Sequence, residues 1–111
     1  MVFIELPVFT RCAQELFEEN QLVRLQLMLL ENPEAGDRIP GGRGLRKLRV
    51  PLQGRGKSGG ARIIYYNWVS ESRCYLVYAY AKNHAADLSK RQLKQLADLM
   101  AAEVQDGQRK L

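Results

Sequence analysis

Hydrophobic positions in the first part of the chain recur with the period of an α-helix, after a short extended start. Residues 2–6 (VFIEL) predict an opening strand, and Pro7 marks the change of period. The first helical stripe consists of Phe9, Cys12, Ala13, Leu16 and Phe17. Glu15, Glu18 and Glu19 fall on the polar side of the same segment. The pattern therefore predicts an amphipathic helix.

A second helical stripe follows and predicts a helical hairpin. Its apolar members are Leu22, Leu25, Met28 and Leu29. Asn20 is the predicted break between the two helices, and Asn32-Pro33 ends the second, because proline disfavours the helical conformation in the residue before it. Residues 33–44 (PEAGDRIPGGRG) carry turn residues without an apolar period, which predicts an ordered loop.

The second half of the chain has the composition of strands followed by one helix. Residues 45–50, 61–69 and 74–82 are rich in β-branched and aromatic residues and predict an antiparallel meander. Ser89 and Gln92 form the pattern of a capping box. The stripe that follows them is Leu93, Leu96, Ala97, Met100 and Val104. The sequence thus predicts one α+β domain over residues 1–111, with an antiparallel sheet, an N-terminal helical hairpin and a C-terminal helix.

Length and composition narrow the class of protein. A chain of 111 residues is sufficient for one core, and no stretch approaches the roughly 20 apolar residues of a membrane span. We therefore expect a cytoplasmic protein that does not associate with a membrane. Cys12 and Cys74 lack metal-ligand spacing and are too few for a disulfide framework, which predicts reduced, packed thiols, with neither metal nor cofactor.

The net charge of +5 is concentrated in one block. Residues 1–37 hold seven acids and two bases, whereas residues 38–62 hold eight bases, no acid and seven glycines. The basic residues of this block are Arg38, Arg43, Arg46, Lys47, Arg49, Arg55, Lys57 and Arg62. Clustered positive charge favours a polyanion, because binding displaces counterions from phosphates. A solvated surface loop is the alternative.

The segment GRGKSGG ends like a nucleotide-binding phosphate loop but does not fit one. The required first glycine falls at Pro51, and the residues after Gly60 predict a strand instead of a helix. A basic hairpin loop, whose glycines allow close approach of the backbone to a partner, is the better interpretation.

The last hairpin predicts two converging cations. If Val69 lies opposite Arg73, Arg62 lies opposite Tyr80 and Lys82 opposite Gly60, so Arg62 and Lys82 point to one face roughly 7 to 8 Å apart. A one-residue slip would separate them. The alternative for Arg62 is an arginine whose stem packs at the edge of the sheet.

In the preceding strand, Lys47 and Arg49 share a face with Leu45, whereas Arg46 shares the other face with Leu48 and Val50. If Leu48 and Val50 pack inward, Lys47 and Arg49 join the face of Arg62 and Lys82. Such a cluster suits RNA cleavage, because charge that builds on the scissile phosphate needs fixed cations.

Other candidates lie around this cluster. His84 follows the last strand, where a general acid or base is useful, although a lone histidine is also an ordinary surface residue. We expect one or two of the strand aromatics to stack on a base and the others to pack the sheet. Lys90, Arg91 and Lys94 oppose the dipole at the start of the last helix, which an anionic partner would offset.

The strings GLRKLRV, GRGKSGGARIIYY and YAYAKNHAADLS resemble the HigB-like branch of the RelE toxin superfamily. The resemblance covers nearly the whole chain. It implies a RelE-like fold and a toxin of a type II toxin–antitoxin system, with a cognate antitoxin of helix-turn-helix type. It also implies a ribosome-dependent mRNA endonuclease, acting in the A site of the small ribosomal subunit by metal-independent attack of a ribose 2′-hydroxyl on the adjacent phosphate.

The resemblance also implies roles for individual residues. Arg62, Lys47, Arg49 and Lys82 resemble the family's catalytic cations, and His84 is a candidate for the acid or base. Arg46, Arg55, Lys57, Lys90 and Arg91 are the expected RNA and ribosome contacts. Asn83 stands where some relatives carry an arginine, and the C-terminus lacks the stacking tyrosine of others. The competing functions are a ParE-like toxin that binds DNA gyrase without chemistry, and a plain RNA-binding ribosome factor.

Overall fold

The structure, a computed structural model, describes residues 1–52, 60–82 and 88–109. These residues form three α-helices and a five-stranded sheet with the order β1-β5-β4-β3-β2. The strands are β1 (Val2–Glu5), β2 (Asp37–Arg38), β3 (Leu45–Val50), β4 (Ala61–Trp68) and β5 (Arg73–Ala81). The helices are α1 (Pro7–Leu16), α2 (Glu19–Glu31) and α3 (Lys90–Arg109). The predicted α+β class, helical hairpin and C-terminal helix are confirmed.

Two differences concern the edges of the sheet. The meander β3-β4-β5 is antiparallel as expected, but β1 pairs with β5 in parallel, with Val2 opposite Arg73, so the sheet is mixed. The segment predicted as a loop contains the two-residue strand β2, which pairs with β3. Strand pairing depends on a partner distant in sequence, and for this reason the local pattern did not reveal either contact.

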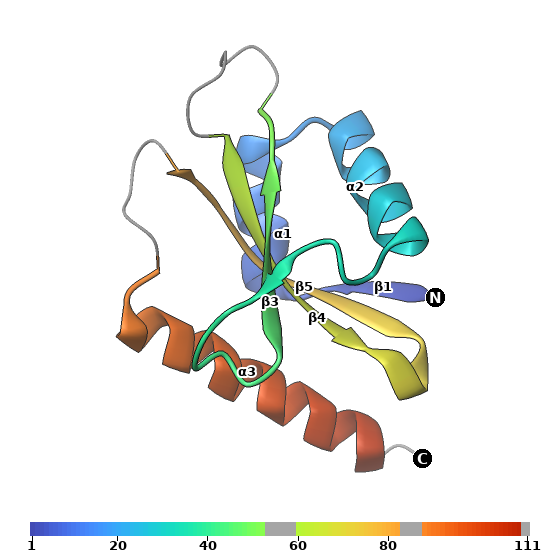
Figure 1. Cartoon of the computed structure of the whole chain (residues 1–111), viewed down its shortest axis with the longest axis vertical. Helices are drawn as coiled ribbons and strands as arrows, with labels where there is room; N and C mark the ends of the chain where they lie inside the picture. The colour runs from blue at the N-terminus through green and yellow to red at the C-terminus, as the bar shows by residue number, and fades with distance from the viewer. Residues whose placement is uncertain (53–59, 83–87, 110–111) are drawn as a thin grey trace.

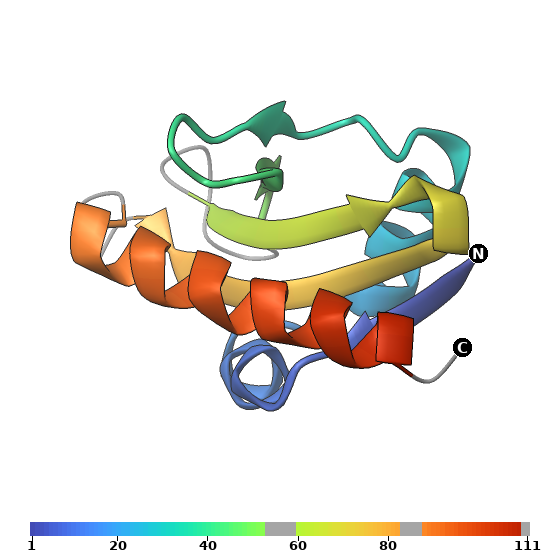
Figure 2. The same cartoon turned by 90° about the horizontal axis from the view of Figure 1, so that it is seen from below.

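The two faces of the sheet are covered by different helices (Figures 1 and 2). Phe9 and Ala13 of α1 and Leu25 and Leu29 of α2 pack against one face, where Ile63 and other strand residues meet them. On the other face, α3 packs through Leu96, Ala97 and Met100 against residues that include Ile64 and Val77. The sheet therefore separates the helical hairpin from α3, and each face has its own core.

The helix boundaries follow local capping. The break in the hairpin lies at Phe17–Glu18 and not at the predicted Asn20, because Glu18 and Gln21 form a capping box in which the Glu18 N–H donates to Gln21 Oε1 at 2.9 Å. The predicted box of α3 is confirmed, since the Gln92 N–H donates to Ser89 Oγ at 3.1 Å. Within the described ranges, no helix is long and apolar enough to cross a bilayer.

Met28 was predicted in the buried stripe of α2 but is 41% exposed. The side of α2 that faces the sheet is narrower than the sequence indicates, because only Leu25 and Leu29 of this helix are fully buried. Cys74 is buried and Cys12 is partly buried, and both thiols are free, as expected for packed cysteines. Burial raises the pKa of the Cys74 thiol to about 12.

Candidate functional site on the sheet

The predicted hairpin register is correct at one end and wrong at the other. Arg62 lies opposite Tyr80, as predicted, but Arg73 lies opposite Trp68 instead of Val69. A β-bulge accounts for the difference: Ile64 pairs with Tyr78 and the next residue, Tyr65, pairs with Leu76, which leaves Val77 as the extra residue on β5. Near the turn the register differs from the predicted one by a single residue, and the bulge removes this difference. Arg62 and Tyr80 are therefore paired as predicted and lie on the same side of the sheet.

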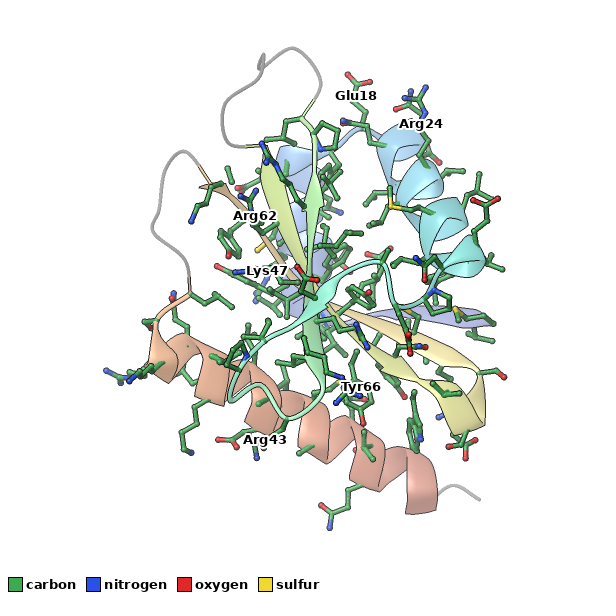
Figure 3. All side chains as sticks on the ribbon, viewed as in Figure 1. Glu18, Arg24, Arg43, Lys47, Arg62 and Tyr66 are labelled. Carbon is green, nitrogen blue, oxygen red and sulfur yellow. The ribbon has the colours of Figure 1, made fainter. Side chains whose placement is uncertain are left out.

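Four predicted cations are brought to the side of the sheet that packs on α3. Leu48 and Val50 point into the core of the helical hairpin, which places Lys47 and Arg49 on the opposite side with Leu45. Arg49 is the direct partner of Arg62. The Lys82 N–H donates to the Gly60 carbonyl at 3.0 Å, which continues the same register and places Lys82 diagonal to Arg62. We call Lys47, Arg49, Arg62 and Lys82 the cationic strand face. Figure 3 labels Lys47 and Arg62 of this face.

The geometry of this face is dominated by a pair of like charges. Arg49 and Arg62 are directly opposed across β3 and β4, an arrangement that destabilises a sheet by up to about 1 kcal/mol. Arg49 is exposed, whereas Arg62 is partly exposed and donates from Nη1 to the Ala61 carbonyl at 3.3 Å. Arginines at directly opposed strand positions can each present a fork of N–H donors to the oxygens of one phosphate.

Tyrosine rings border the cationic strand face. Tyr80 lies opposite Arg62, and its ring stacks on that of Tyr78 with centroids 5.9 Å apart. Both side chains are partly exposed. Burial, and secondarily the nearby Cys12 thiol, raises the pKa of Tyr78. Tyr80 was not distinguished from the other aromatics at the sequence level, although the predicted hairpin already placed it opposite Arg62.

Arg46 lies apart from the other predicted cations. It is on the opposite side of the sheet, where Nη1 donates to the Gly36 carbonyl at 2.7 Å and the side chain is only 15% exposed. The buried Tyr65 hydroxyl accepts the Gly36 N–H at 2.9 Å and donates to the Pro33 carbonyl at 2.8 Å. Arg46 and Tyr65 thus fix the connection between α2 and β2, and the role of Arg46 in RNA binding stays a prediction.

A group of ion pairs joins the β2–β3 loop to α3, through Asp98, a partner that the sequence did not identify for Arg43 and Lys94. Arg43 has a φ of 52°, a left-handed conformation uncommon outside glycine, and its Nη2 lies 2.5 Å from Asp98 Oδ1. Lys94 Nζ approaches the other carboxylate oxygen at 3.0 Å. The hydrogen bond from Arg43, and then that from Lys94, lowers the pKa of Asp98. The predicted contacts Lys90 and Arg91 are exposed in the first turn of the same helix.

Arg55, Lys57, Asn83 and His84 lie outside the described residues, so the structure adds nothing to their predicted roles. Among the residues that are described, no three His, Cys, Asp or Glu side chains gather as metal ligands. The described part of the cationic strand face therefore offers two chemical functions. Its guanidinium and ammonium groups can neutralise a phosphodiester, and a tyrosine ring beside them can stack on a base.

Two comparisons relate this geometry to known proteins. A family model described as the RelE toxin of the RelE/RelB toxin–antitoxin system matches residues 8–111. Among solved structures, a double arginine-to-alanine mutant of the Escherichia coli toxin RelE in the free state superimposes with a TM-score of 0.53. That pair is 17% identical in sequence, and the match covers 85% of this chain and 95% of the other. This structural likeness concerns the fold.

Proposed function

Since this chain belongs to the RelE toxin family, we propose that it acts as a ribosome-dependent mRNA endonuclease that stops translation. The observation that carries the proposal is the direct opposition of Arg49 and Arg62 across β3 and β4. A sheet gains nothing in stability from this pair, whereas a scissile phosphate between the two guanidinium groups would turn repulsion into attraction.

The proposed reaction needs no redox partner. The ribose 2′-oxygen forms a bond to the adjacent phosphorus while the bond from phosphorus to the 5′-oxygen breaks. The proton of the 2′-hydroxyl passes to a base, and the leaving 5′-oxygen takes up a proton. The products are a 2′,3′-cyclic phosphate and a 5′-hydroxyl end. Negative charge grows on the non-bridging oxygens, where fixed donors stabilise the transition state more than the ground state.

The roles of individual residues follow from their positions. Arg62 and Arg49 would hold the non-bridging oxygens, and Lys47 and Lys82, from the neighbouring rows of β3 and β5, would complete the neutralisation. Tyr80, next to Arg62, would stack on the base beside the cleaved bond. His84 stays a candidate for the proton transfers. Because the described residues of the cationic strand face include no strong general base, we propose that the ribosome contributes by positioning the mRNA.

Contacts with ribosomal RNA are proposed for Lys90 and Arg91, and also for Arg55 and Lys57. Lys90 and Arg91 lie at the start of α3 without a described ion-pair partner. Positive charges at a helix N-terminus interact unfavourably with the helix dipole. Phosphates placed there would remove that penalty. These contacts would position the toxin in the A site without reading sequence.

The experiment compares translated and untranslated copies of one message by primer extension. Wild type should cut only the translated copy, and Arg62→Ala should abolish most of the cleavage. Arg11→Ala is a matched control, because Arg11 is an exposed arginine of α1, on the other side of the sheet. Equal cleavage of both copies contradicts ribosome dependence. Arrest of growth with intact mRNA and inhibited gyrase would replace the nuclease with the ParE-like alternative.

The family implies a cognate antitoxin, and we propose that this partner, of helix-turn-helix type, covers the cationic strand face with an acidic or mixed segment. Crowded cations need a counter-charge, and the association should weaken as salt screens it. Titration of the complex at low and high ionic strength tests this proposal. An affinity that does not change with salt would contradict it.

A further inference from the structure

Helix α2 is apolar on more sides than its contact with the sheet uses. Seven of its 13 residues are aliphatic or methionine, yet Leu25 and Leu29 are the two that are fully buried. Contiguous exposed apolar residues mark a contact surface for another molecule, whereas single exposed apolar residues need no explanation. The remaining apolar residues of α2 therefore require an explanation beyond the core of the monomer.

The uncovered residues form one stripe. Val23 is 51% exposed, Leu27 is 59% exposed and Leu30 is 51% exposed. Their spacing of four and then three residues places them on one side of the helix, about one turn apart. Leu27 and Leu30 also line a shallow, open depression of the surface with Met28 and Glu31. We call Val23, Leu27 and Leu30 the α2 stripe.

Two charged residues flank this stripe on the same side. Arg24 and Glu31 are seven residues apart, nearly two full turns, so they lie in one row beside the α2 stripe. In the part of the chain that is described, neither residue has an ion-pair partner, and both are exposed. Figure 3 shows Arg24 on the outer side of α2, away from the sheet.

The positions of these residues are self-complementary. If two copies of α2 pack antiparallel about a two-fold axis near Leu27, Val23 of one copy lies beside Leu30 of the other, because both are about one turn from the axis. The same axis brings Arg24 of one copy to Glu31 of the other, and this ion pair occurs twice. A uniformly acidic or basic partner would match only one of these two charges.

From this symmetry we propose that the chain forms a two-fold homodimer through the α2 stripe, with reciprocal Arg24–Glu31 ion pairs at its border. The inference does not depend on nuclease activity. The helical hairpin lies on the opposite side of the sheet from Arg62, so the dimer would leave both cationic strand faces uncovered. Each copy would therefore present its site outward.

Sedimentation velocity of the full chain, freed from its antitoxin, tests the dimer over about two decades of concentration. Wild type should shift from monomer to dimer, and Leu27→Glu should stay monomeric. Leu99→Glu is the matched control, since Leu99 is an exposed leucine of α3, 41% accessible, and its substitution should leave the dimer intact. A wild type that stays monomeric throughout, or a dimer that survives Leu27→Glu, overturns the proposal.

A charge exchange tests the antiparallel arrangement itself. Arg24→Glu alone and Glu31→Arg alone should each raise the dissociation constant by about fivefold or more, because each creates two like-charge contacts. The double exchange should restore the wild-type value. Failure of the double variant to recover contradicts the proposed register. If wild type is monomeric and Leu27→Glu instead weakens binding of the purified antitoxin, the stripe belongs to the antitoxin and the dimer is refuted.

Discussion

Replacement of Arg62 by alanine should separate catalysis from stability, because the two effects have opposite signs. Arg62 faces Arg49 directly, so its removal relieves a repulsion of up to about 1 kcal/mol, and loss of contacts of its partly buried stem offsets part of this gain. A net change of about 0.5 kcal/mol corresponds to about 2 °C in Tm for a chain of 111 residues. We therefore expect a Tm at or slightly above that of wild type.

Cleavage should respond in the other direction. Loss of one fixed donor to the developing charge costs about 3 kcal/mol in the barrier, which is roughly a hundredfold in rate. Arg62→Lys should recover only part of this rate, because lysine keeps the charge but lacks the planar fork of donors. The ribosome-bound fraction should be unchanged, since these losses arise in the transition state.

The assay measures Tm and single-turnover cleavage of ribosome-bound mRNA on the same preparation, with Arg11→Ala as the control for loss of one positive charge. A well-folded Arg62→Ala protein with near-native cleavage would remove this residue from the mechanism. A Tm lowered by more than about 4 °C with normal cleavage per folded molecule would refute the electrostatic reasoning and show that the arginine stem stabilises the sheet.

Three further predictions concern packing away from the cationic strand face. Tyr65→Phe should lower the free energy of unfolding by about 1 to 3 kcal/mol in urea titrations, because two backbone groups of the α2–β2 connection lose their partner; a change within error would contradict this. The pKa of Cys74 is raised to about 12, so the neutral thiol favours the folded state and this contribution is lost as pH rises from about 9 towards 12. Cys74→Ala should flatten that part of the stability profile, and an unchanged slope would argue against it. Gly107→Ala places a methyl group 2.9 Å from the ring of Trp68, the single tryptophan. The fluorescence emission of Trp68 should therefore shift to the red as the end of α3 loosens. An unchanged spectrum would show that the ring moves aside without loosening the helix.

The predictable part of the structure is the part controlled by neighbours in sequence. Ser89 and Gln92 predicted the start of α3 because a capping box involves residues three apart. The alternation of Leu45, Lys47 and Arg49 predicted that these residues share one face of β3, but it did not decide which face lies on the hairpin core. Both patterns involve residues two or three positions apart, so they can be recognised in the sequence without knowledge of the fold.

Contacts between distant segments were not predictable. Arg43 and Asp98 are 55 residues apart, and Arg46 is held by a connection that Tyr65 fixes from another strand. No periodicity encodes such pairs, because each partner has an ordinary local environment. The hairpin register was predicted from its turn, and it is correct at Arg62 only because a β-bulge lies between the turn and the site. No residue type in the sequence indicates this bulge.

The bulge at Val77 divides the β4–β5 hairpin into two parts. The pairing near the turn and the pairing near Arg62 differ in register by one residue. Insertion of one residue in the turn of a hairpin can shift the register and move every side chain beyond it to the other face of the sheet. Here, loss of the extra residue at Val77 would compensate for such an insertion and keep Tyr80 and Lys82 on the side of Arg62. Among homologous sequences, a one-residue insertion in this turn should therefore be accompanied by loss of the extra residue near position 77. Deletion of Val77 alone should remove the bulge and leave Arg62 opposite Tyr80.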